Sequence, residues 1–166
     1  MRRAIDGDTI ELTDGRLVRY LGIDAPEVRR RAGGTWVLDP EPMGLEATEA
    51  NRRLVEGRRV RLEYDARSRD RFGRLLAYVY VGDTMANAEL LRLGLARPLI
   101  LPPNAKYEEH FRRLADEAQR QGRGMWGRRV RASEPPRRDG GPAEAGSGPG
   151  PQPIPAAAGT SGTGAD

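Results

Sequence analysis

The first 27 residues hold a cluster of acidic residues and one arginine that could act together on a phosphate ester. Asp6 and Asp8 lie in the first apolar segment, Arg19 lies in the second, and Asp24 and Glu27 follow it around an Ala-Pro turn. Apolar residues surround these charged side chains, so plain surface solvation explains the whole set poorly. Carboxylates and a guanidinium at strand ends are the groups needed to bind a hard cation and attack a phosphodiester. Metal-dependent phosphodiester cleavage is therefore the first hypothesis.

Each member of the cluster has a role in this hypothesis and an ordinary alternative. Asp8 and Asp24 would hold a divalent cation, because a hairpin between their strands can bring them together; alternatively, they are turn or capping acids. Glu27 is the candidate base for the attacking water. Arg19 and Arg74 would stabilise charge on the phosphate oxygens. Otherwise, Arg19 forms a structural salt bridge and Arg74 is a solvated residue at a strand end.

Composition limits the kind of metal and the kind of partner. The 166-residue chain has no cysteine and one histidine, so a metal would be bound by oxygen atoms, which favours Ca²⁺ or Mg²⁺. A formal net charge of +4 suits DNA or RNA without proving either. No apolar run approaches transmembrane length, and the first residues do not resemble a signal peptide. Localisation stays open: we expect a cytoplasmic protein, or a secreted or envelope-associated one if an export signal precedes Met1.

Alternation and turn signals predict the elements that would position these residues. We expect strands at 4–12, 16–23, 58–65, 75–81 and 84–85, and helices at 45–56, 87–93 and 106–121. Thr13-Asp14-Gly15 would join the first two strands as a hairpin, and Asn87 would be the N-cap of the second helix. Alternation places Arg19 with Leu17 and Leu21 on a core-like face, where a guanidinium needs an anionic partner. Five short strands favour an α+β fold, a five-stranded OB-fold β-barrel with about three helices.

Residues 28–42 are predicted to form a long polar loop. The loop contains Arg29, Arg30 and Arg31 and the aromatic Trp36. We expect these residues to contact substrate, with the arginines on phosphates and the indole on a base. An ordinary mobile, solvated loop is the alternative.

The chain divides into a folded domain and a tail. Residues 133–166 contain 7 Pro and 8 Gly among 34 residues and show no apolar periodicity. Such a segment cannot bury enough apolar surface to offset the entropy of ordering it. We therefore expect one folded domain at 1–127 and a disordered Pro/Gly-rich tail at 128–166.

Several stretches, in order along the chain, resemble the thermonuclease family, also called staphylococcal-nuclease-like domains. They are residues 4–9, 19–27, 44–47, 69–79 and 87–96. The resemblance implies an OB-fold barrel with three helices. It also implies Ca²⁺-dependent, sugar-nonspecific cleavage of DNA and RNA that leaves 3′-phosphate ends.

The same resemblance implies roles for individual residues. Asp8 and Asp24 match the family's carboxylate ligands for Ca²⁺, and Ala25 lies where the family supplies a backbone carbonyl ligand. Glu27 matches the glutamate that activates water, and Arg19 and Arg74 match the two arginines that bind phosphate. One departure is the segment 98–103, which has no tyrosine where the best-known members place tyrosines against the nucleotide.

Two non-enzymatic functions remain as alternatives on the same fold. One is a non-catalytic nucleic-acid-binding or scaffold module, and the other is a protein-interaction barrel. Degenerate domains of this kind lose the acids or the arginines, whereas this chain keeps Asp8, Arg19, Asp24, Glu27 and Arg74 together. We therefore expect a monomeric nuclease that acts on DNA and RNA.

Overall fold

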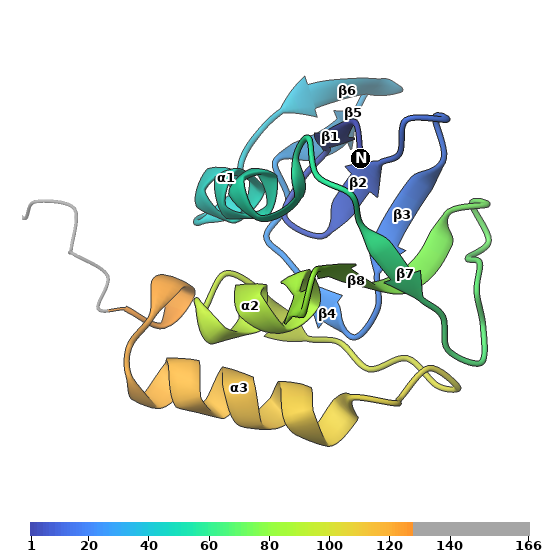
Figure 1. Cartoon of the computed structure of the whole chain (residues 1–166). Helices are drawn as coiled ribbons and strands as arrows, with labels where there is room; N and C mark the ends of the chain where they lie inside the picture. The colour runs from blue at the N-terminus through green and yellow to red at the C-terminus, as the bar shows by residue number, and fades with distance from the viewer. Residues whose placement is uncertain (128–166) are drawn as a thin grey trace, which may run out of the picture. The chain divides into compact units, whose positions relative to one another are not determined.

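The structure, a computed structural model, describes residues 1–127; the tail predicted at 128–166 lies outside the described residues. The strands are β1 (Arg3–Ala4), β2 (Thr9–Glu11), β3 (Leu17–Tyr20), β4 (Ile23–Asp24), β5 (Arg29–Ala32), β6 (Thr35–Leu38), β7 (Arg61–Glu63), β8 (Leu75–Val81), β9 (Thr84–Met85) and β10 (Arg97–Pro98). The helices are α1 (Gly44–Val55), α2 (Ala86–Arg92), α3 (Glu108–Arg120) and the short 3₁₀ helix η1 (Gly124–Trp126) (Figure 1). Among residues 1–127, none of the helices is both long and apolar enough to cross a membrane.

One curled sheet forms the centre of the domain. Its strands follow the order β1-β2-β3-β8-β7, with the short β9 added beside β8. Neighbouring strands are antiparallel except β3 and β8, which run parallel. The valines and tyrosines of β8 suit a buried strand. Helix α2 packs on β8, α3 packs on α2, and α1 packs on β1 and α2. The three helices and the curled sheet confirm the predicted α+β OB-fold.

The predicted first strand at 4–12 is instead two short strands that pair with each other. Strands β1 and β2 are antiparallel around a turn at 5–8, with Ala4 opposite Ile10. Gly7 lies in this turn, and a Cβ added to it would lie 2.6 Å from the Cβ of Ala25 and 2.8 Å from that of Ala47. Only glycine lets the backbone come this close to α1. Asp8 therefore sits at the end of a tightly packed turn and not within a strand.

The buried face of β3 is not the one that alternation predicted. Val18 and Tyr20 are almost completely buried, whereas Leu17 on the other face is 38% exposed. Arg19 lies on the face with Leu17, outside the apolar core. The prediction erred because a short strand with an apolar residue at nearly every position gives no period from which to choose the inner face.

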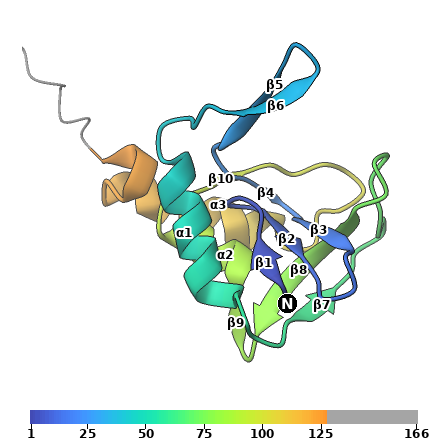
Figure 2. The same cartoon turned by 90° about the horizontal axis from the view of Figure 1, so that it is seen from above.

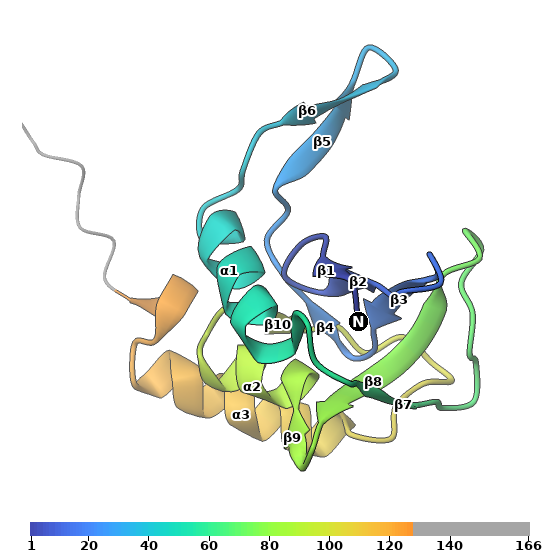
Figure 3. The same cartoon turned by 45° about the horizontal axis from the view of Figure 1, so that its top comes forward.

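Residues 28–42, predicted as a loop, contain the antiparallel hairpin of β5 and β6. Gly33 and Gly34 connect the two strands with φ angles of 56° and 83°. Two consecutive positive φ angles are what a two-residue hairpin turn of type I′ requires, and glycine adopts them without strain. The hairpin extends away from the rest of the described domain (Figures 2 and 3).

Asn87, predicted as a helix N-cap, is instead a buried residue inside α2. The backbone N–H of Val79 donates to its Oδ1 at 2.9 Å, and its Nδ2 donates to the carbonyl of Leu21 at 2.9 Å. Met85 precedes the helix without a capping side chain. The amide of Asn87 therefore ties α2 both to β8 and to the turn that follows β3.

A single apolar core lies between the sheet and the helices. Its largest members are almost fully shielded from solvent: Tyr20, Tyr78, Phe111, Ile10, Ile23, Leu90, Leu91, Val18, Val55 and Val79. Burying an aliphatic or aromatic side chain of this size stabilises a fold by roughly 1.5–3 kcal/mol. This core fixes β3, which carries Arg19, and β4, which carries Asp24.

Candidate active site

Arg19 joins the two carboxylates predicted to bind a metal. Its Nη2 atom lies 3.2 Å from Oδ2 of Asp8 and 2.9 Å from Oδ1 of Asp24. Its Nη1 atom donates hydrogen bonds to the carbonyls of Tyr20 and Ile23 at 2.9 and 2.8 Å. The side chain is only 15% exposed. Four oxygen contacts therefore hold the guanidinium in one place at the edge of the acidic cluster.

Asp8 is the buried member of the cluster. Its Oδ2 accepts a hydrogen bond from the backbone N–H of Ala25 at 2.7 Å, and its own N–H donates to Oδ1 of Asp6 at 3.0 Å. Burial raises the pKa of Asp8 to about 7; the charge of Arg19 acts against this rise, and the charge of Asp6 adds to it. The arginine thus offsets only part of the cost of ionising Asp8.

The turn that carries Asp6 and Asp8 is held from α1. Asn51 of α1 is fully buried, and its Nδ2 donates to the carbonyl of Asp6 at 2.8 Å. The hydroxyl of Tyr20 donates to Oδ1 of Asn51 at 2.7 Å. Helix α1 and strand β3 therefore position the acidic turn through one shared amide.

Glu27 is exposed, but its backbone is fixed by the segment before α1. Its N–H donates to Oε2 of Glu41 at 3.0 Å, and the N–H of Glu41 donates back to its carbonyl at 2.8 Å. A Cβ added to Gly44 would lie 2.6 Å from the same carbonyl oxygen. Partial burial, and then the negative charges of Asp6 and Asp24, raise the pKa of Glu27. Its carboxylate is therefore within electrostatic reach of the cluster.

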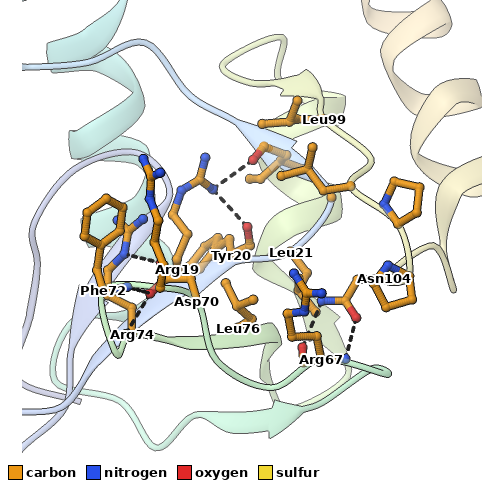
Figure 4. A pocket seen from close by; sticks show the side chains of 16 residues that line it. Arg19, Tyr20, Leu21, Arg67, Asp70, Phe72, Arg74, Leu76, Leu99 and Asn104 are labelled. Carbon is orange, nitrogen blue, oxygen red and sulfur yellow. Dashed lines mark hydrogen bonds and ion pairs between the residues drawn. The ribbon is translucent and has the colours of Figure 1, made fainter.

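Arg74 faces the pocket that Arg19 also lines (Figure 4). The pocket has a volume of about 360 Å³. Asp70 holds Arg74 through two hydrogen bonds, from Nε to Oδ2 at 2.7 Å and from the backbone N–H to Oδ1 at 3.0 Å. Burial acts to raise the pKa of Asp70, but the hydrogen bonds and charge of Arg74 more than offset it, so this pKa is lowered.

The segment without tyrosine forms another part of the pocket wall. Leu99 and Leu101 line it from the stretch at 98–103, and they are 39% and 62% exposed. Phe72, which is 68% exposed, lies on the pocket beside Arg74. Apolar and aromatic surface therefore adjoins the two arginines.

The structure brings most of the predicted residues together. Asp8, Arg19 and Asp24 are in direct contact, and Ala25 joins them through its backbone N–H. Arg74 shares a pocket with Arg19. The substrate contacts predicted in 28–42 lie on the β5–β6 hairpin, and none of them lines that pocket: Arg29, Arg30, Arg31 and Trp36.

Three residues that matter for positioning were missed from the sequence: Asp70, Glu41 and Asn51. Asp70 carried a signal, because an aspartate that precedes Phe72-Gly73 commonly accepts hydrogen bonds from the backbone of its own turn. The N–H groups of Phe72 and Arg74 both donate to it here. Glu41 carried no signal, since its contact with Glu27 depends on the way the hairpin closes.

The cluster fits an oxygen-ligated cation by the chemistry of its donors. No three acidic or histidine side chains among residues 1–127 converge as a metal-binding group. The atoms at hand are the carboxylates of Asp8 and Asp24 and nearby backbone oxygens, and the Asp24 side chain is 54% exposed. Oxygen donors of this kind, completed by water, suit Ca²⁺ or Mg²⁺. One guanidinium, that of Arg19, faces the two carboxylates, so the group carries excess negative charge when both are ionised.

Comparison with known proteins places the chain in a family. The staphylococcal nuclease homologue family matches residues 17–128. The chain is 40% identical over 131 residues to the thermonuclease of Staphylococcus intermedius, an alignment that covers 77% of this chain and 75% of that protein. It is 40% identical over 127 residues to the thermonuclease of Staphylococcus hyicus, covering 75% and 72%. It is also 40% identical over 129 residues to the SPbeta prophage-derived endonuclease YokF of Bacillus subtilis, covering 75% of this chain and 42% of that protein. The chain therefore belongs to the family of staphylococcal nuclease homologues.

Proposed function

We propose that this protein is a Ca²⁺-dependent nuclease that hydrolyses phosphodiester bonds in DNA and RNA without selecting the sugar. The relatives named thermonuclease and endonuclease support the nuclease assignment. The observation that carries the proposal is the single guanidinium of Arg19 held between Asp8 and Asp24 at the edge of a pocket. A phosphate group in that pocket would meet Arg19 and Arg74, and Glu27 lies next to the same acidic cluster.

Glu27 has the properties of a general base in this reaction. A base works best when its pKa approaches the working pH, and the pKa of Glu27 is raised above its usual value. Its exposed side chain can reach a water molecule, whereas Asp8 is buried. Glu27 would take a proton from the water as that water attacks phosphorus. We propose that the bond from phosphorus to the 5′ oxygen breaks, and that this oxygen takes a proton from water and leaves as a 5′-hydroxyl, so the other product ends in a 3′-phosphate.

The two arginines act on the charge that builds up during this attack. The phosphoryl oxygens gain negative charge in the transition state, and a planar guanidinium can bind two of them at once. Arg19 is preorganised by four oxygen contacts, and Arg74 by the carboxylate of Asp70. Arg74 uses only its Nε for Asp70, so its Nη groups can face the phosphate, whereas Arg19 would exchange some of its protein contacts for phosphoryl oxygens.

Asp8, Asp24 and the carbonyl of Ala25 would hold Ca²⁺ in this proposal. When bound, the cation would supply further positive charge to offset the charge that develops on the phosphate. The support is the oxygen-only donor set and the pairing of two carboxylates with a single guanidinium. A non-catalytic nucleic-acid-binding module of the same fold is the competing function, and it would not need these acids and arginines together.

A digestion assay tests the proposal. Purified protein is expected to degrade plasmid DNA, single-stranded DNA and RNA when Ca²⁺ is present, and to stop when a chelator is added. Activity that is indifferent to chelator would remove the cation from the proposal. Folded protein that binds nucleic acid but never cleaves it would support the non-catalytic function instead.

The variant Glu27→Gln tests the base. It keeps the size of the side chain but cannot accept a proton, so we expect kcat to fall by roughly 100- to 10,000-fold with little change in DNA binding. Glu109→Gln is the matched control, because Glu109 lies on α3 with 88% of its side chain exposed. A wild-type rate for Glu27→Gln would rule out this role.

A further inference from the structure

The β5–β6 hairpin has two faces with different chemistry. Residues directly opposite each other in an antiparallel pair share a face, and successive pairs alternate between faces. Arg29 is opposite Leu38, and Arg31 is opposite Trp36. One face therefore carries two guanidiniums, an indole and a leucine. We call these four residues the arm face.

The arm face is open to solvent, and its charge is not neutralised by neighbours. Trp36 is 65% exposed, and Arg29 and Arg31 are both exposed. Within the described part of the chain, no acidic group forms an ion pair with Arg29 or Arg31. Arg30 differs, because it points to the other face and forms an ion pair with Asp39. Of the three consecutive arginines, the two beside the indole are thus the ones free to bind an anion.

We propose that the arm face binds a single-stranded segment of nucleic acid, with a base stacked on Trp36 and phosphates on Arg29 and Arg31. The inference rests on the proposed nuclease function. An exposed aromatic ring flanked by basic side chains is how proteins hold single strands without reading sequence. A base inside a duplex is already stacked on its neighbours, so it cannot lie flat on Trp36. No acidic residue lies on the arm face, so its charge complements a phosphate backbone.

The β5–β6 hairpin is joined directly to the segment that carries the proposed catalytic base, Glu27. The N–H of Asp39 donates to the carbonyl of Val28 at 3.1 Å, and the N–H of Glu41 donates to the carbonyl of Glu27 at 2.8 Å. The side chain of Glu41 in turn accepts from the N–H of Glu27. These bonds close the root of the hairpin onto the segment that carries Glu27.

This connection gives the arm a role in placing substrate. The hairpin extends from the domain, and its root begins one residue after Glu27 (Figures 2 and 3). A strand bound along the arm would therefore lead toward Glu27. The arm would lengthen the binding surface beyond the pocket that holds Arg19 and Arg74. Substrates long enough to reach it would bind more tightly.

Binding can be measured without cleavage. The full chain, kept in chelator, is titrated with a short oligothymidylate, with an abasic oligonucleotide of the same phosphate number and with a blunt duplex. The wild type is expected to bind the oligothymidylate most tightly, with a change in tryptophan fluorescence. Trp36→Ala should raise the Kd for oligothymidylate by roughly 5- to 100-fold, the range for one stacked base, and have much less effect on the abasic strand. An unchanged Kd for oligothymidylate, or equal losses for both strands, overturns the proposal.

Two neighbouring arginines provide a matched test of the charge. Arg31→Gln and Arg30→Gln each remove one positive charge, but from opposite faces of the hairpin. Arg31→Gln is expected to weaken binding of the oligothymidylate and to reduce the slope of log K against log salt concentration by about one phosphate contact. Arg30→Gln should change both the Kd and this slope less. Equal effects would assign the binding to net charge and contradict the arm face. Val37→Ala, on the opposite face, should bind like the wild type, and circular dichroism checks that each variant is folded.

Kinetics separates this proposal from the proposed function. If the protein cleaves, Trp36→Ala should raise KM for a long single strand while kcat changes little. If the protein cleaves and Trp36→Ala leaves both KM and Kd unchanged, binding at the arm face is rejected and the nuclease assignment stays intact. Binding that depends on Trp36 in a protein that never cleaves would reject the nuclease assignment alone. Phosphatidylglycerol vesicles serve as a competitor for the bound oligothymidylate. If the vesicles displace it from the wild type and bind Trp36→Ala much more weakly, the arm face binds a membrane surface and the proposal is overturned.

Discussion

At the scale of single residues, the two arginines of the pocket differ in how many partners hold their side chains. Arg19 has four oxygen partners from four residues, so the loss of one partner leaves three. Arg74 has one acidic partner, Asp70, which binds both its side chain and its backbone. The position of Arg74 therefore depends on a single acidic residue.

Asp70→Asn tests this positioning role. The amide can still accept from the backbone, but the charged contact to the Arg74 guanidinium is lost. A charge-assisted hydrogen bond contributes about 1.5–3 kcal/mol, so we expect kcat to fall about tenfold or more. Combining it with Arg74→Ala should add almost nothing, because both changes act on one group.

Asp14→Asn is the matched control for this variant. Asp14 makes the same pair of contacts to Arg16 in an exposed turn, with Nε to Oδ2 at 2.7 Å and N–H to Oδ1 at 3.1 Å. Its substitution should leave kcat at the wild-type value. Additive losses in the Asp70→Asn, Arg74→Ala double variant would show that Asp70 acts independently of Arg74.

Residue types predicted that Arg19 would have an anionic partner, because the chemistry of a guanidinium demands one. A guanidinium in an apolar strand needs an anion, and this reasoning found the contacts of Arg19 with Asp8 and Asp24 although it chose the wrong face of β3. Positioning residues were harder to find. The role of Glu41 depends on a backbone contact made only when the hairpin closes, and no local pattern encodes such a contact.

At the scale of secondary structure elements, the side-chain amide of Asn87 links α2 to β8 and to the turn after β3 by hydrogen bonds. Asn87 satisfies the buried N–H of Val79 in β8 and the carbonyl of Leu21 after β3. Asn87→Ala would leave both backbone groups without a partner in the core. Each buried, unsatisfied group costs about 1–3 kcal/mol, so we expect a loss of roughly 2–4 kcal/mol in the free energy of unfolding, measured with urea.

Gln119→Ala is the control for this prediction. Gln119 is exposed on α3, and a surface substitution of this kind changes stability by roughly 0.5 kcal/mol or less. If Asn87→Ala lowers the free energy of unfolding no more than Gln119→Ala does, water must replace the hydrogen bonds of the lost amide. The turn after β3 would then not depend on α2.

Long periodic elements were predictable, whereas most short strands were not; the exception is β9, which lies at 84–85 as predicted. The apolar run of β8 and the amphipathic pattern of α3 predicted both elements to within a few residues. The β5–β6 hairpin was missed although Gly33-Gly34 is a recognised signal for a two-residue turn, because three arginines beside it read as a polar loop. The turn between β1 and β2 was missed because its cause, the close approach of Gly7 to α1, is a tertiary contact.

At the scale of the whole molecule, acidic groups join the sheet to the start of α3. Asp65 accepts from the hydroxyl of Tyr78 at 2.9 Å and from the N–H of Lys106 at 3.1 Å, and Glu63 accepts from Nζ of Lys106 and from the hydroxyl of Tyr107. Burial acts to raise the pKa of Asp65, but these hydrogen bonds lower it overall. The hydrogen bond from Lys106 is the main reason that the pKa of Glu63 is lowered.

These pKa values predict a loss of stability in acid. Both carboxyl groups bind protons less readily in the folded chain, so they stabilise the fold above the unfolded pKa values of about 3.9 for Asp and 4.3 for Glu. That contribution disappears as the pH falls through their lowered folded values. The urea midpoint should therefore drop as the pH is taken from about 6 to about 3.

Asp65→Asn should have a shallower pH dependence over this range, because its amide does not titrate. Asp116→Asn, an exposed substitution on α3, should keep the wild-type slope. Identical slopes for all three proteins would assign the acid sensitivity to other groups. The comparison uses differences between proteins, so the other carboxyl groups cancel.

The closed root of the β5–β6 hairpin has a consequence for how this protein can diverge. The bonds from Asp39 to Val28 and from Glu41 to Glu27 seal the hairpin at its base. Substitutions, insertions or deletions near the tip at Gly33 and Gly34 can then accumulate without disturbing the segment that carries Glu27. Evolution can therefore alter what the hairpin recognises independently of the bond that is cut, and engineers can graft a different recognition element at the tip.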